Sequence, residues 1–377
     1  MNRLFVHIVA LSFALLVVGI LLFVNKKTIL HYYAKPLKQT LEKTVELQND
    51  LENGKIVLFG SSELVFYPNQ RFLPQNFFNN ELKQPIKTQG NEGQQSFAIF
   101  SQLAACENDR VKENAKVVIL LSPSWFTGKE DNGTKIPKFL EFMYPGMMNK
   151  LYFQSTAKEE YKVVIQEYIK KNIDSIKNPN YLYTTSIETI KEEYFDNKIK
   201  EIIIDTFDNR SQETIDYKNP LLDYEKLKIE AQKIVAYSNN NSFGIQNEYY
   251  TKFIEPSIQN GTFPFSIMVP KNLSQNQEYQ DFLLLLELLQ SYQIKPFFVI
   301  EDLHPEIFSK NRDEMTQLIV TIKSKLEEYE YSYFDMWSYE KKEYEMGTLI
   351  DMVHMGELGW LKINQQIIDY FMPQQRD

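Results

Sequence analysis

The chain has 377 residues, and its 41 Lys and Arg against 50 Asp and Glu give a formal net charge of -9 at pH 7. Hydrophobic residues make up 43% of the sequence and aromatic residues 14%, which excludes intrinsic disorder and collagen-like folds. The acidic balance argues against nucleic acid as the main partner, because binding phosphates requires clustered Lys and Arg. With a single cysteine, Cys106, the chain can form neither an intramolecular disulfide nor a cysteine-based metal site.

The first predicted element is a membrane-spanning helix. Leu4 to Val24 form 21 almost uninterrupted apolar positions, and a helix of this length is about 32 Å long, close to the bilayer core of roughly 30 Å. A cleaved signal peptide is the alternative, but its apolar run usually covers about 7–15 residues and ends at small residues. Here the run leads into Asn25-Lys26-Lys27. We therefore expect residues 1–27 to be an uncleaved anchor, with everything after residue 25 on one side of the membrane.

Residues 28–54 are predicted to form a helical stalk. Between Pro36 and Glu52, apolar residues recur at near-helical spacing, namely Leu37, Leu41, Val45 and Leu51. Asn53-Gly54 is a typical helix stop signal. The folded domain is therefore expected to cover residues 55–377.

Short apolar runs alternate with helical patterns in this domain. The runs typical of buried strands are Lys55–Phe59, Val117–Leu121, Pro296–Ile300 and, less strongly, Tyr331–Phe334. Helical patterns cover Gln94–Asn108, Gln280–Tyr292 and Arg312–Tyr329. This alternation predicts an α/β fold with a doubly wound parallel sheet and helices on both faces, a three-layer α/β/α arrangement.

One long segment, about residues 128–275, does not follow that alternation. It is rich in Lys, Glu, Asn and Tyr, and its amphipathic stretches are Lys158–Asn172 and Tyr224–Tyr237. We expect a mainly helical insertion that packs on the sheet or caps a cleft, with a solvated charged surface. The sequence has no fixed-period repeat or low-complexity linker that would indicate separate domains.

A serine pair follows the first predicted strand in the sequence Gly60-Ser61-Ser62-Glu63-Leu64. In doubly wound sheets, ligands bind beyond the carboxyl ends of the strands. A serine at such a turn can act as a nucleophile while nearby backbone N–H groups bind an oxyanion. The alternative is a serine-rich turn that caps the next helix, with Glu63 in its first turn.

A possible partner for this serine lies near the end of the chain. His354 follows Asp351 by three positions, a spacing that lets the carboxylate accept from one ring nitrogen and fix the tautomer. The other nitrogen could then take a proton from a hydroxyl nucleophile. Of the other three histidines, two lie in or next to the predicted anchor, and His304, in a loop after a strand, is a minor candidate. Together with Ser62, the pair forms a coherent candidate triad.

Other polar and aromatic motifs favour structural interpretations. Trp125, Trp337 and Trp360 could line an acceptor groove, but buried packing is the more common role of tryptophan. The sequence contains no Gly-rich phosphate loop, zinc-spaced His pair or EF-hand pattern. We therefore expect no metal or nucleotide cofactor.

These motifs resemble the SGNH (GDSL-type) hydrolase superfamily, in which a serine after the first strand pairs with a late Asp-x-x-His. The α/β-hydrolases also use a Ser, Asp, His order, but they need a G-x-S-x-G elbow that this sequence lacks. More closely, the chain resembles the D-alanyl transfer proteins of Gram-positive bacteria, the DltD family, over nearly its whole length. Besides the apolar N-terminus, the matching stretches are Phe59–Leu64, Gly93–Ser96, Ser122–Phe126, Asn247–Tyr250 and Asp351–Trp360.

The resemblance implies roles for individual residues. Ser62 takes the place of the nucleophile, and Asp351 and His354 take the places of its partners. Gly93 falls where the second superfamily block supplies an oxyanion N–H group. Ser124 stands where an Asn or Gln side chain is expected, and its hydroxyl could donate one hydrogen bond while reaching less far. Trp125, beside it, is a candidate for substrate binding.

The resemblance also implies an activity, a location and partners. The protein would be a membrane-anchored, extracytoplasmic acyl transferase that places D-alanine esters on lipoteichoic acid, without a cofactor. A membrane-bound O-acyltransferase and the D-alanyl carrier system would be its partners. Two alternatives stay open: a surface esterase or thioesterase that uses water as the acceptor, and a non-catalytic module that binds the carrier or the polymer.

Overall fold

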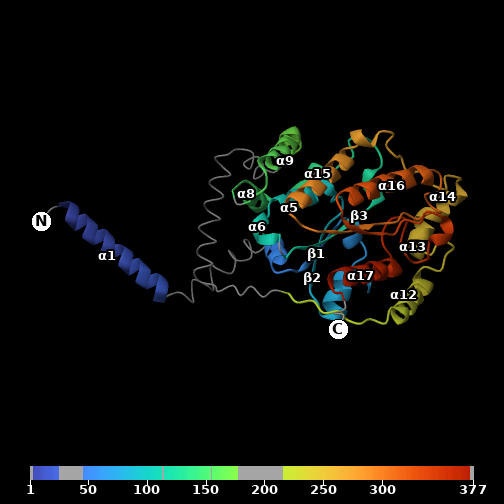
Figure 1. Cartoon of the computed structure of the whole chain (residues 1–377), viewed down its shortest axis with the longest axis horizontal. Helices are drawn as coiled ribbons and strands as arrows, with labels where there is room; N and C mark the ends of the chain where they lie inside the picture. Colours follow the sequence, from blue (N-terminus) through green and yellow to red (C-terminus); the bar gives the residue numbers. More distant parts are fainter. Residues whose placement is uncertain (1–2, 25–45, 113, 154, 177–214, 374–377) are drawn as a thin grey trace.

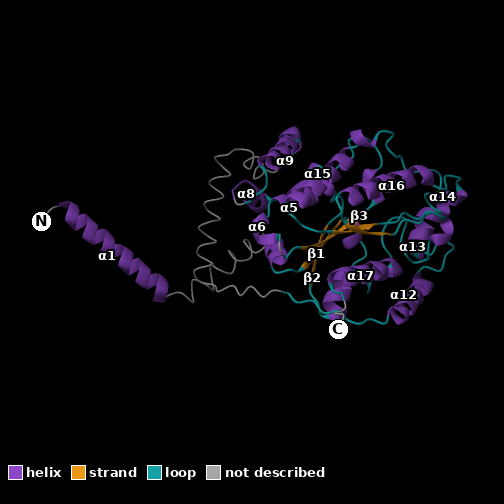
Figure 2. Ribbon diagram, in the orientation of Figure 1, coloured by secondary structure: helices purple, strands orange, loops and turns teal. Residues whose placement is uncertain are grey.

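The computed structural model describes residues 3–24, 46–112, 114–153, 155–176 and 215–373 (Figure 1). Its centre is a five-stranded sheet in which all neighbouring strands are parallel, in the order β2-β1-β3-β4-β5 (Figure 2). The strands are β1 (Ile56–Gly60), β2 (Ile86–Gly90), β3 (Lys116–Leu121), β4 (Phe297–Ile300) and β5 (Ser332–Asp335). The parallel α/β sheet predicted from the sequence is therefore confirmed.

Helices cover both faces of the sheet. Because side chains alternate along a strand, Val57 and Phe59 face one core while Ile56 and Leu58 face the other. The first core is closed by α5 (Ser96–Ala104), α15 (Gln277–Ser291) and α16 (Arg312–Glu328). The second is closed by α17 (Glu357–Phe371), α4 (Pro74–Asn76) and the π-helical turn η3 (Phe77–Leu82). Figure 2 shows α5, α15 and α16 on the side of the sheet opposite α17.

The edge strand β2 is the one strand that the sequence does not predict. Its sequence is Ile-Lys-Thr-Gln-Gly, and among its residues only Ile86 is buried. A strand at the edge of a sheet needs no continuous apolar run, because a neighbour covers only one of its sides. Its polar sequence therefore looks like a loop when read alone.

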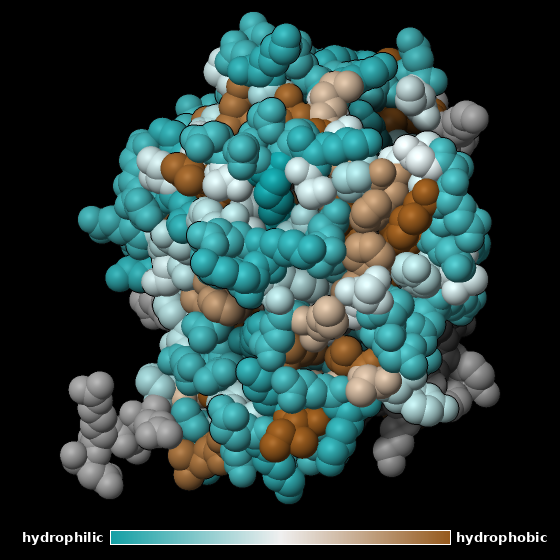
Figure 3. All heavy atoms as spheres, turned by 90° about the vertical axis from the view of Figure 1, so that its right-hand side faces the viewer, coloured by the Kyte–Doolittle hydropathy of each residue, from teal (hydrophilic) through white to brown (hydrophobic). Residues whose placement is uncertain are grey.

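The remaining helices lie before, between and after the strands. The bounds of the helices are α6 (Asn108–Val111), α7 (Ile136–Phe142), α8 (Pro145–Phe153), α9 (Glu159–Lys171), α12 (Tyr224–Ser238), α13 (Asn247–Tyr249) and α14 (Glu255–Gln259). The described part of the segment from residue 128 to 275 contains helices and turns but no strand. Helices α9 and α12 match its two predicted amphipathic stretches. Figure 3 views the side of the molecule that carries α12, α13 and α14, and this side is mostly hydrophilic with small apolar patches. Short 3₁₀ or π turns are η2 (Ser62–Leu64), η4 (Pro123–Phe126), η5 (Ile173–Ser175), η7 (Tyr250–Ile254), η8 (Leu273–Gln275) and η9 (Lys341–Glu343).

The N-terminal predictions fall partly outside the described residues. The apolar segment forms helix α1 (Arg3–Val24). Judged by length and hydropathy, none of the helices in the described ranges qualifies as a membrane span. The anchor predicted at residues 1–27 therefore rests on the sequence pattern. Most of the predicted stalk, residues 28–45, lies outside the described residues; its end, residues 46–52, is helical, with Leu47 and Leu51 buried in the first core.

Candidate active site

The order in which the chain adds strands to the sheet reverses at β1, which lies between β2 and β3. This reversal creates a topological switch point between β1 and β3. In doubly wound sheets, ligands bind at the switch point, beyond the carboxyl ends of the strands. The segments that follow β2, β1 and β3 contain Gly93, Ser62 and Ser124, respectively. Three of the predicted site residues therefore lie along one edge of the sheet.

The turn after β1 separates the two adjacent serines. Ser61 is buried, and its hydroxyl donates to the carbonyl of Asn91 at 3.3 Å. Its backbone N–H donates to the buried carboxyl of Glu63, which fixes the start of η2. Ser62 is only half-buried, and its hydroxyl lies 2.9 Å from Nε2 of His354. The geometry therefore favours Ser62 over Ser61 as the reactive hydroxyl.

Asp351 and His354 lie in a tight loop before α17. The backbone N–H of Ile350 donates to the carbonyl of His354 at 2.9 Å and closes the loop. Gly356 lets the end of the loop pack closely on the segment before it, because a Cβ at that position would lie 2.4 Å from the carbonyl oxygen of Gly347. Within the loop, Oδ1 of Asp351 accepts the backbone N–H groups of both Val353 and His354, each at 2.8 Å.

The other carboxylate oxygen of Asp351 orients the imidazole. Oδ2 lies 2.6 Å from Nδ1 of His354, so Nδ1 carries the proton and Nε2 accepts from the hydroxyl of Ser62. Burial alone would raise the pKa of Asp351, but the hydrogen bond and charge of His354 and two backbone N–H groups hold it below its ordinary value. Burial would lower the pKa of His354, but Asp351 and the charge of Glu63 outweigh this and raise it. The three side chains can thus move a proton from Ser62 to His354.

Two aromatic residues that follow the serine block contact this triad. The hydroxyl of Tyr67 donates to Oδ2 of Asp351 at 2.9 Å. Burial and the Asp351 charge raise the pKa of Tyr67, so it stays a donor. The ring of Phe66 packs 5.0 Å from the ring of His354, measured between centroids. Sequence reasoning missed both residues, although their place directly after the serine block was an available signal.

Gly93, three residues beyond β2, has a left-handed backbone conformation, and its oxyanion role stays a prediction. Its φ of 76° lies in the left-handed region, which glycine adopts without steric cost. The side-chain amide of Gln95 donates to the carbonyl of Trp125 at 3.5 Å and links this loop to the segment after β3. Ser124 lies in that segment, half-buried, with its Oγ 3.0 Å from Oγ of Ser122.

The predicted tryptophans are buried. Trp125 is 6% exposed and packs in the first core, while Trp337 and Trp360 are 4% and 0% exposed. These values favour the packing interpretation for all three side chains. The substrate-binding role of Trp125 stays a prediction.

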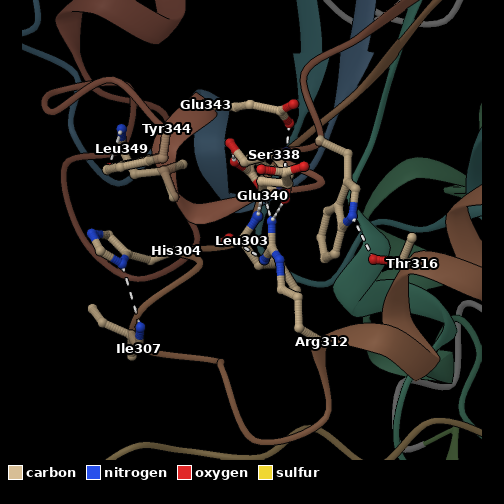
Figure 4. Close-up of polar contacts among 12 residues, drawn as sticks. Leu303, His304, Ile307, Arg312, Thr316, Ser338, Glu340, Glu343, Tyr344 and Leu349 are labelled. Carbon is tan, nitrogen blue, oxygen red and sulfur yellow. Dashed lines mark hydrogen bonds and ion pairs between the residues drawn. The ribbon is translucent and has the colours of Figure 1, made fainter.

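His304 is held by the backbone on both sides of its ring. Nε2 donates to the carbonyl of Phe243 at 2.9 Å. Nδ1 accepts from the N–H of Ile307 at 3.4 Å, the contact that Figure 4 draws. Burial lowers its pKa to about 4, so the ring is neutral at pH 7. Its ring also packs against Tyr344, with 4.6 Å between centroids. With both nitrogens occupied, His304 fits a structural role.

A cavity of about 310 Å³ is lined by the two aromatic residues that contact the candidate triad, although the triad residues themselves are not part of its lining. Phe66 and Tyr67 form one wall, and α12 contributes Val235 and Ser238 to the other. The lining includes the amide side chains of Asn69, Gln70, Asn239 and Gln246. Among the residues that the structure describes, no group of three or more His, Cys, Asp or Glu is placed to hold a metal ion.

Comparison with known proteins assigns the family. The model of the DltD protein family matches residues 31–372. The chain belongs to the DltD family. It is 23% identical over 367 residues to Protein DltD of Staphylococcus aureus (strain NCTC 8325 / PS 47), an alignment that covers 91% of this chain and 88% of the relative. It is also 23% identical over 349 residues to Protein DltD of Bacillus subtilis (strain 168), covering 83% and 81%.

The family match confirms the resemblance that the sequence motifs indicate. The five matching stretches that follow the apolar N-terminus all lie within the matched residues 31–372. The five-stranded parallel sheet of this DltD family member is consistent with an SGNH-like α/β fold.

Proposed function

We propose that this protein is a serine-dependent acyl transferase that acts in the D-alanine esterification of teichoic acid. Membership of the DltD family supports the substrate class. The observation that carries the reaction type is the continuous row of hydrogen bonds from Ser62 through His354 to Asp351, at 2.9 and 2.6 Å. Such a row is how a hydroxyl side chain is activated for acyl transfer.

The first half of the reaction loads the enzyme. Oγ of Ser62 attacks the D-alanyl carbonyl carbon and passes its proton to Nε2 of His354. The bond from that carbon to the donor oxygen or sulfur then breaks, and His354 returns the proton to the leaving group. The backbone N–H of Gly93 and the hydroxyl of Ser124 stabilise the negative oxygen that forms in between.

The second half transfers the group to the polymer. A hydroxyl of the acceptor gives its proton to His354 and attacks the ester on Ser62. The ester bond breaks, and Ser62 regains its proton from His354. The cavity beside Phe66 and Tyr67 offers amide and hydroxyl groups to a hydroxyl-bearing acceptor, and the carboxyl of Glu357, which accepts two backbone N–H groups, also lines it.

Membrane attachment and partners belong to the same proposal. The 22-residue apolar helix α1 would hold the domain at the outer face of the membrane. A membrane-bound O-acyltransferase and the D-alanyl carrier system would supply the D-alanyl group. The attachment is tested by fractionating cells that express the chain with or without residues 1–27. We expect only the form with residues 1–27 in the membrane fraction. Equal recovery of both forms in that fraction would contradict the attachment.

The nucleophile is tested by Ser62→Ala in cells whose own copy has been replaced. We expect loss of ester-linked D-alanine from lipoteichoic acid, at an unchanged level of folded protein. Ser61→Ala is the matched control, because Ser61 bonds to Asn91 and not to His354, and we expect it to retain D-alanylation. Normal D-alanine in both Ser62→Ala and His354→Ala would favour the binding-module alternative. Rapid release of D-alanine to water by the purified protein would favour the esterase.

A further inference from the structure

The side chain of Glu278 holds the start of helix α5 from a different helix. Glu278 lies in the first turn of α15 and is 0% exposed, and its Oε1 accepts the backbone N–H of Ser96 at 3.0 Å. Ser96 is the first residue of α5, so this N–H is one of the donors for which a helix has no partner of its own. The carboxyl can accept it in either protonation state, because both keep an oxygen with free lone pairs. The triad does not account for this contact.

The turn before α5 is fixed at its other end to the serine turn. A tight turn joins β2 to α5, and the N–H of Gln94 closes it by donating to the carbonyl of Asn91 at 3.0 Å. The same carbonyl accepts the hydroxyl of Ser61 at 3.3 Å. The last residues of β1 and β2, which directly precede the two turns, are paired in register. The turn that carries Gly93 is therefore hydrogen-bonded to the residue next to Ser62.

The start of α15 is itself fixed to the segment after β3. The N–H of Glu278 donates to the carbonyl of Asn132 at 3.2 Å. The side chain of Asn132 donates to the carbonyls of Trp125 and Thr127 at 3.0 and 2.6 Å. The carbonyl of Trp125 also accepts the side-chain amide of Gln95, the residue before α5, at 3.5 Å. The start of α15 thus connects the segments that follow β2 and β3 at one edge of the sheet.

Gly93 lies between the two attachments of this turn. Its φ of 76° belongs to the left-handed region, and a glycine backbone is the freest of all residues to leave the conformation it adopts. The direction of its N–H therefore depends on how firmly the two ends of the turn are held. A displacement of about 1 Å in a group that positions the reaction can lower a rate about 10²-fold.

We propose that Glu278 is a positioning residue: by accepting the N–H of Ser96, it fixes the end of the turn that presents the Gly93 N–H to the oxyanion formed at Ser62. This inference rests on the proposed function, because it assumes acyl chemistry at Ser62 and an oxyanion role for Gly93. It adds to the site a side chain that lies 182 positions from Ser96 in the chain.

The contact can be tested without the natural acyl donor. An alkyl fluorophosphonate is the probe: Oγ of Ser62 bonds to phosphorus, the P–F bond breaks, fluoride leaves, and the hydroxyl proton goes to His354. The phosphoryl oxygen takes the place of the oxyanion, so the position of the oxyanion donors affects the rate. Intact-mass measurement on the purified full-length protein gives the limiting rate and the half-saturating probe concentration separately.

Two substitutions of Glu278 separate its hydrogen bond from the bulk of its side chain. Glu278→Leu removes the acceptor. We expect the limiting rate to fall about tenfold or more, with little change in half-saturation, because the turn is no longer held at one end. Glu278→Gln keeps an acceptor oxygen for the Ser96 N–H, and its limiting rate should stay within about threefold of the wild type.

Ser96→Pro removes the donor of the same hydrogen bond and serves if Glu278→Leu does not fold. Proline suits the first position of a helix, and Gln95 before it is extended, with φ of -138° and ψ of -175°, as a residue before proline prefers. We expect Ser96→Pro to lose as much limiting rate as Glu278→Leu. The double variant should lose no more than either single variant, because both substitutions remove one and the same interaction.

Ser155→Ala is the matched control, because it loosens the other end of α5. Ser155 is buried, accepts the N–H of Ala157 at 3.0 Å and donates to the carbonyl of Ala104, the last residue of α5. We expect Ser155→Ala, like Glu278→Leu, to lower the free energy of unfolding in urea. Its limiting rate of labelling should stay at the wild-type value.

Four results would overturn the role of Glu278. They are a wild-type limiting rate in Glu278→Leu, equal losses in Glu278→Gln and Glu278→Leu, independent losses that multiply in the double variant, or the same loss of rate in Ser155→Ala. The proposed function fails by a different result. If Ser62→Ala reacts with the probe as fast as the wild type, Ser62 is not the nucleophile, whatever the Glu278 variants do.

Discussion

Oγ of Ser62 and Nε2 of His354 lie 2.9 Å apart although 292 positions separate them in the chain. Ser62 is placed by the turn after β1, and His354 by the loop before α17. Asp351 fixes the ring from the opposite side at 2.6 Å. Because three separate hydrogen bonds hold the Asp351 carboxylate in the loop, the alignment of the imidazole is set before any substrate binds.

Asp351→Asn should disable the site by changing the tautomer of His354. Oδ1 of Asp351 accepts two backbone N–H groups, so the new amide oxygen takes that place and the NH₂ group faces Nδ1. The proton of His354 then moves to Nε2, which no longer accepts from Ser62. An alkyl fluorophosphonate measures this: Oγ of Ser62 bonds to phosphorus, fluoride leaves, the hydroxyl proton goes to His354, and the labelled protein is counted by intact mass. We expect the labelling rate to fall about 10²- to 10⁴-fold, with an unchanged circular dichroism spectrum.

Tyr67→Phe is the matched comparison for that change. It removes one hydrogen bond to Oδ2 of Asp351 but leaves the carboxylate and the tautomer in place. We expect a loss of labelling rate of about tenfold, the low end of what one hydrogen bond to a charged group contributes. Equal losses in Tyr67→Phe and Asp351→Asn would contradict the tautomer argument.

The fall of the labelling rate at acid pH should reflect protonation of the His354 imidazole. The neutral imidazole is the base, so the rate falls as pH drops through its pKa, which Asp351 and Glu63 raise above the ordinary value. In Asp351→Asn the main raising interaction is gone and burial lowers the pKa. The residual rate of that variant should therefore lose its acid decline or show it at lower pH. A shift to higher pH would contradict this assignment.

The sequence predicts those parts of the fold and site that depend on local pattern or chemical type. Strands β1, β3 and β4 are apolar runs, and β5 overlaps the weaker predicted run Tyr331–Phe334. Strand β2 has only Ile86 buried and resembles a loop. Ser62 and His354 stand out because few residue types can perform their chemistry.

The roles of residues that act through long-range contacts do not follow from local pattern. Tyr67 lies directly after the serine block, but its contact with Asp351, 284 positions away, is known only from the fold. The same explanation holds for His304, whose ring nitrogens meet backbone groups of Phe243 and Ile307. The sequence shows a histidine after a strand, but the partners of its ring are known only from the fold.

Gly93→Ala should impair the site more than its backbone cost alone explains. An alanine in the left-handed region costs about 1–2 kcal/mol, and its Cβ would also lie 3.2 Å from Cγ of Lys138. Gly261 has nearly the same φ, 74°, and a Cβ at that position would have no described atom within 4 Å. Gly261→Ala therefore carries the backbone cost without the contact and lies away from the candidate site residues in sequence.

We expect both glycine variants to lose similar stability in urea unfolding, and only Gly93→Ala to lose labelling of Ser62, by about tenfold or more if one oxyanion donor is displaced. Equal labelling rates in the two variants would remove Gly93 from the oxyanion loop.

Arg312→Met should destabilise the fold through Asp302. Asp302 is 0% exposed, and Arg312 donates to it at 2.7 Å. Arg312 also donates to the carbonyls of Leu303 and Ser338, two residues that Figure 4 labels. Removing one member of a buried pair leaves an uncompensated charge, which costs about 3–5 kcal/mol. Urea unfolding of the domain should show this loss, and the double variant Arg312→Met with Asp302→Asn should recover part of it.

The Arg312–Asp302 pair also predicts how the stability lost in Arg312→Met depends on pH. Burial raises the pKa of Asp302 even with Arg312 present, and Arg312→Met removes the charge that opposes this rise. The folded protein then binds a proton that the unfolded chain releases, so stability falls as pH rises through the folded pKa. The stability difference between wild type and Arg312→Met should therefore be larger at pH 8 than at pH 5. A difference that is equal at both pH values, or larger at pH 5, would mean that Arg312 stabilises through its packing on Trp337, 3.5 Å from the ring centroid, and not through Asp302.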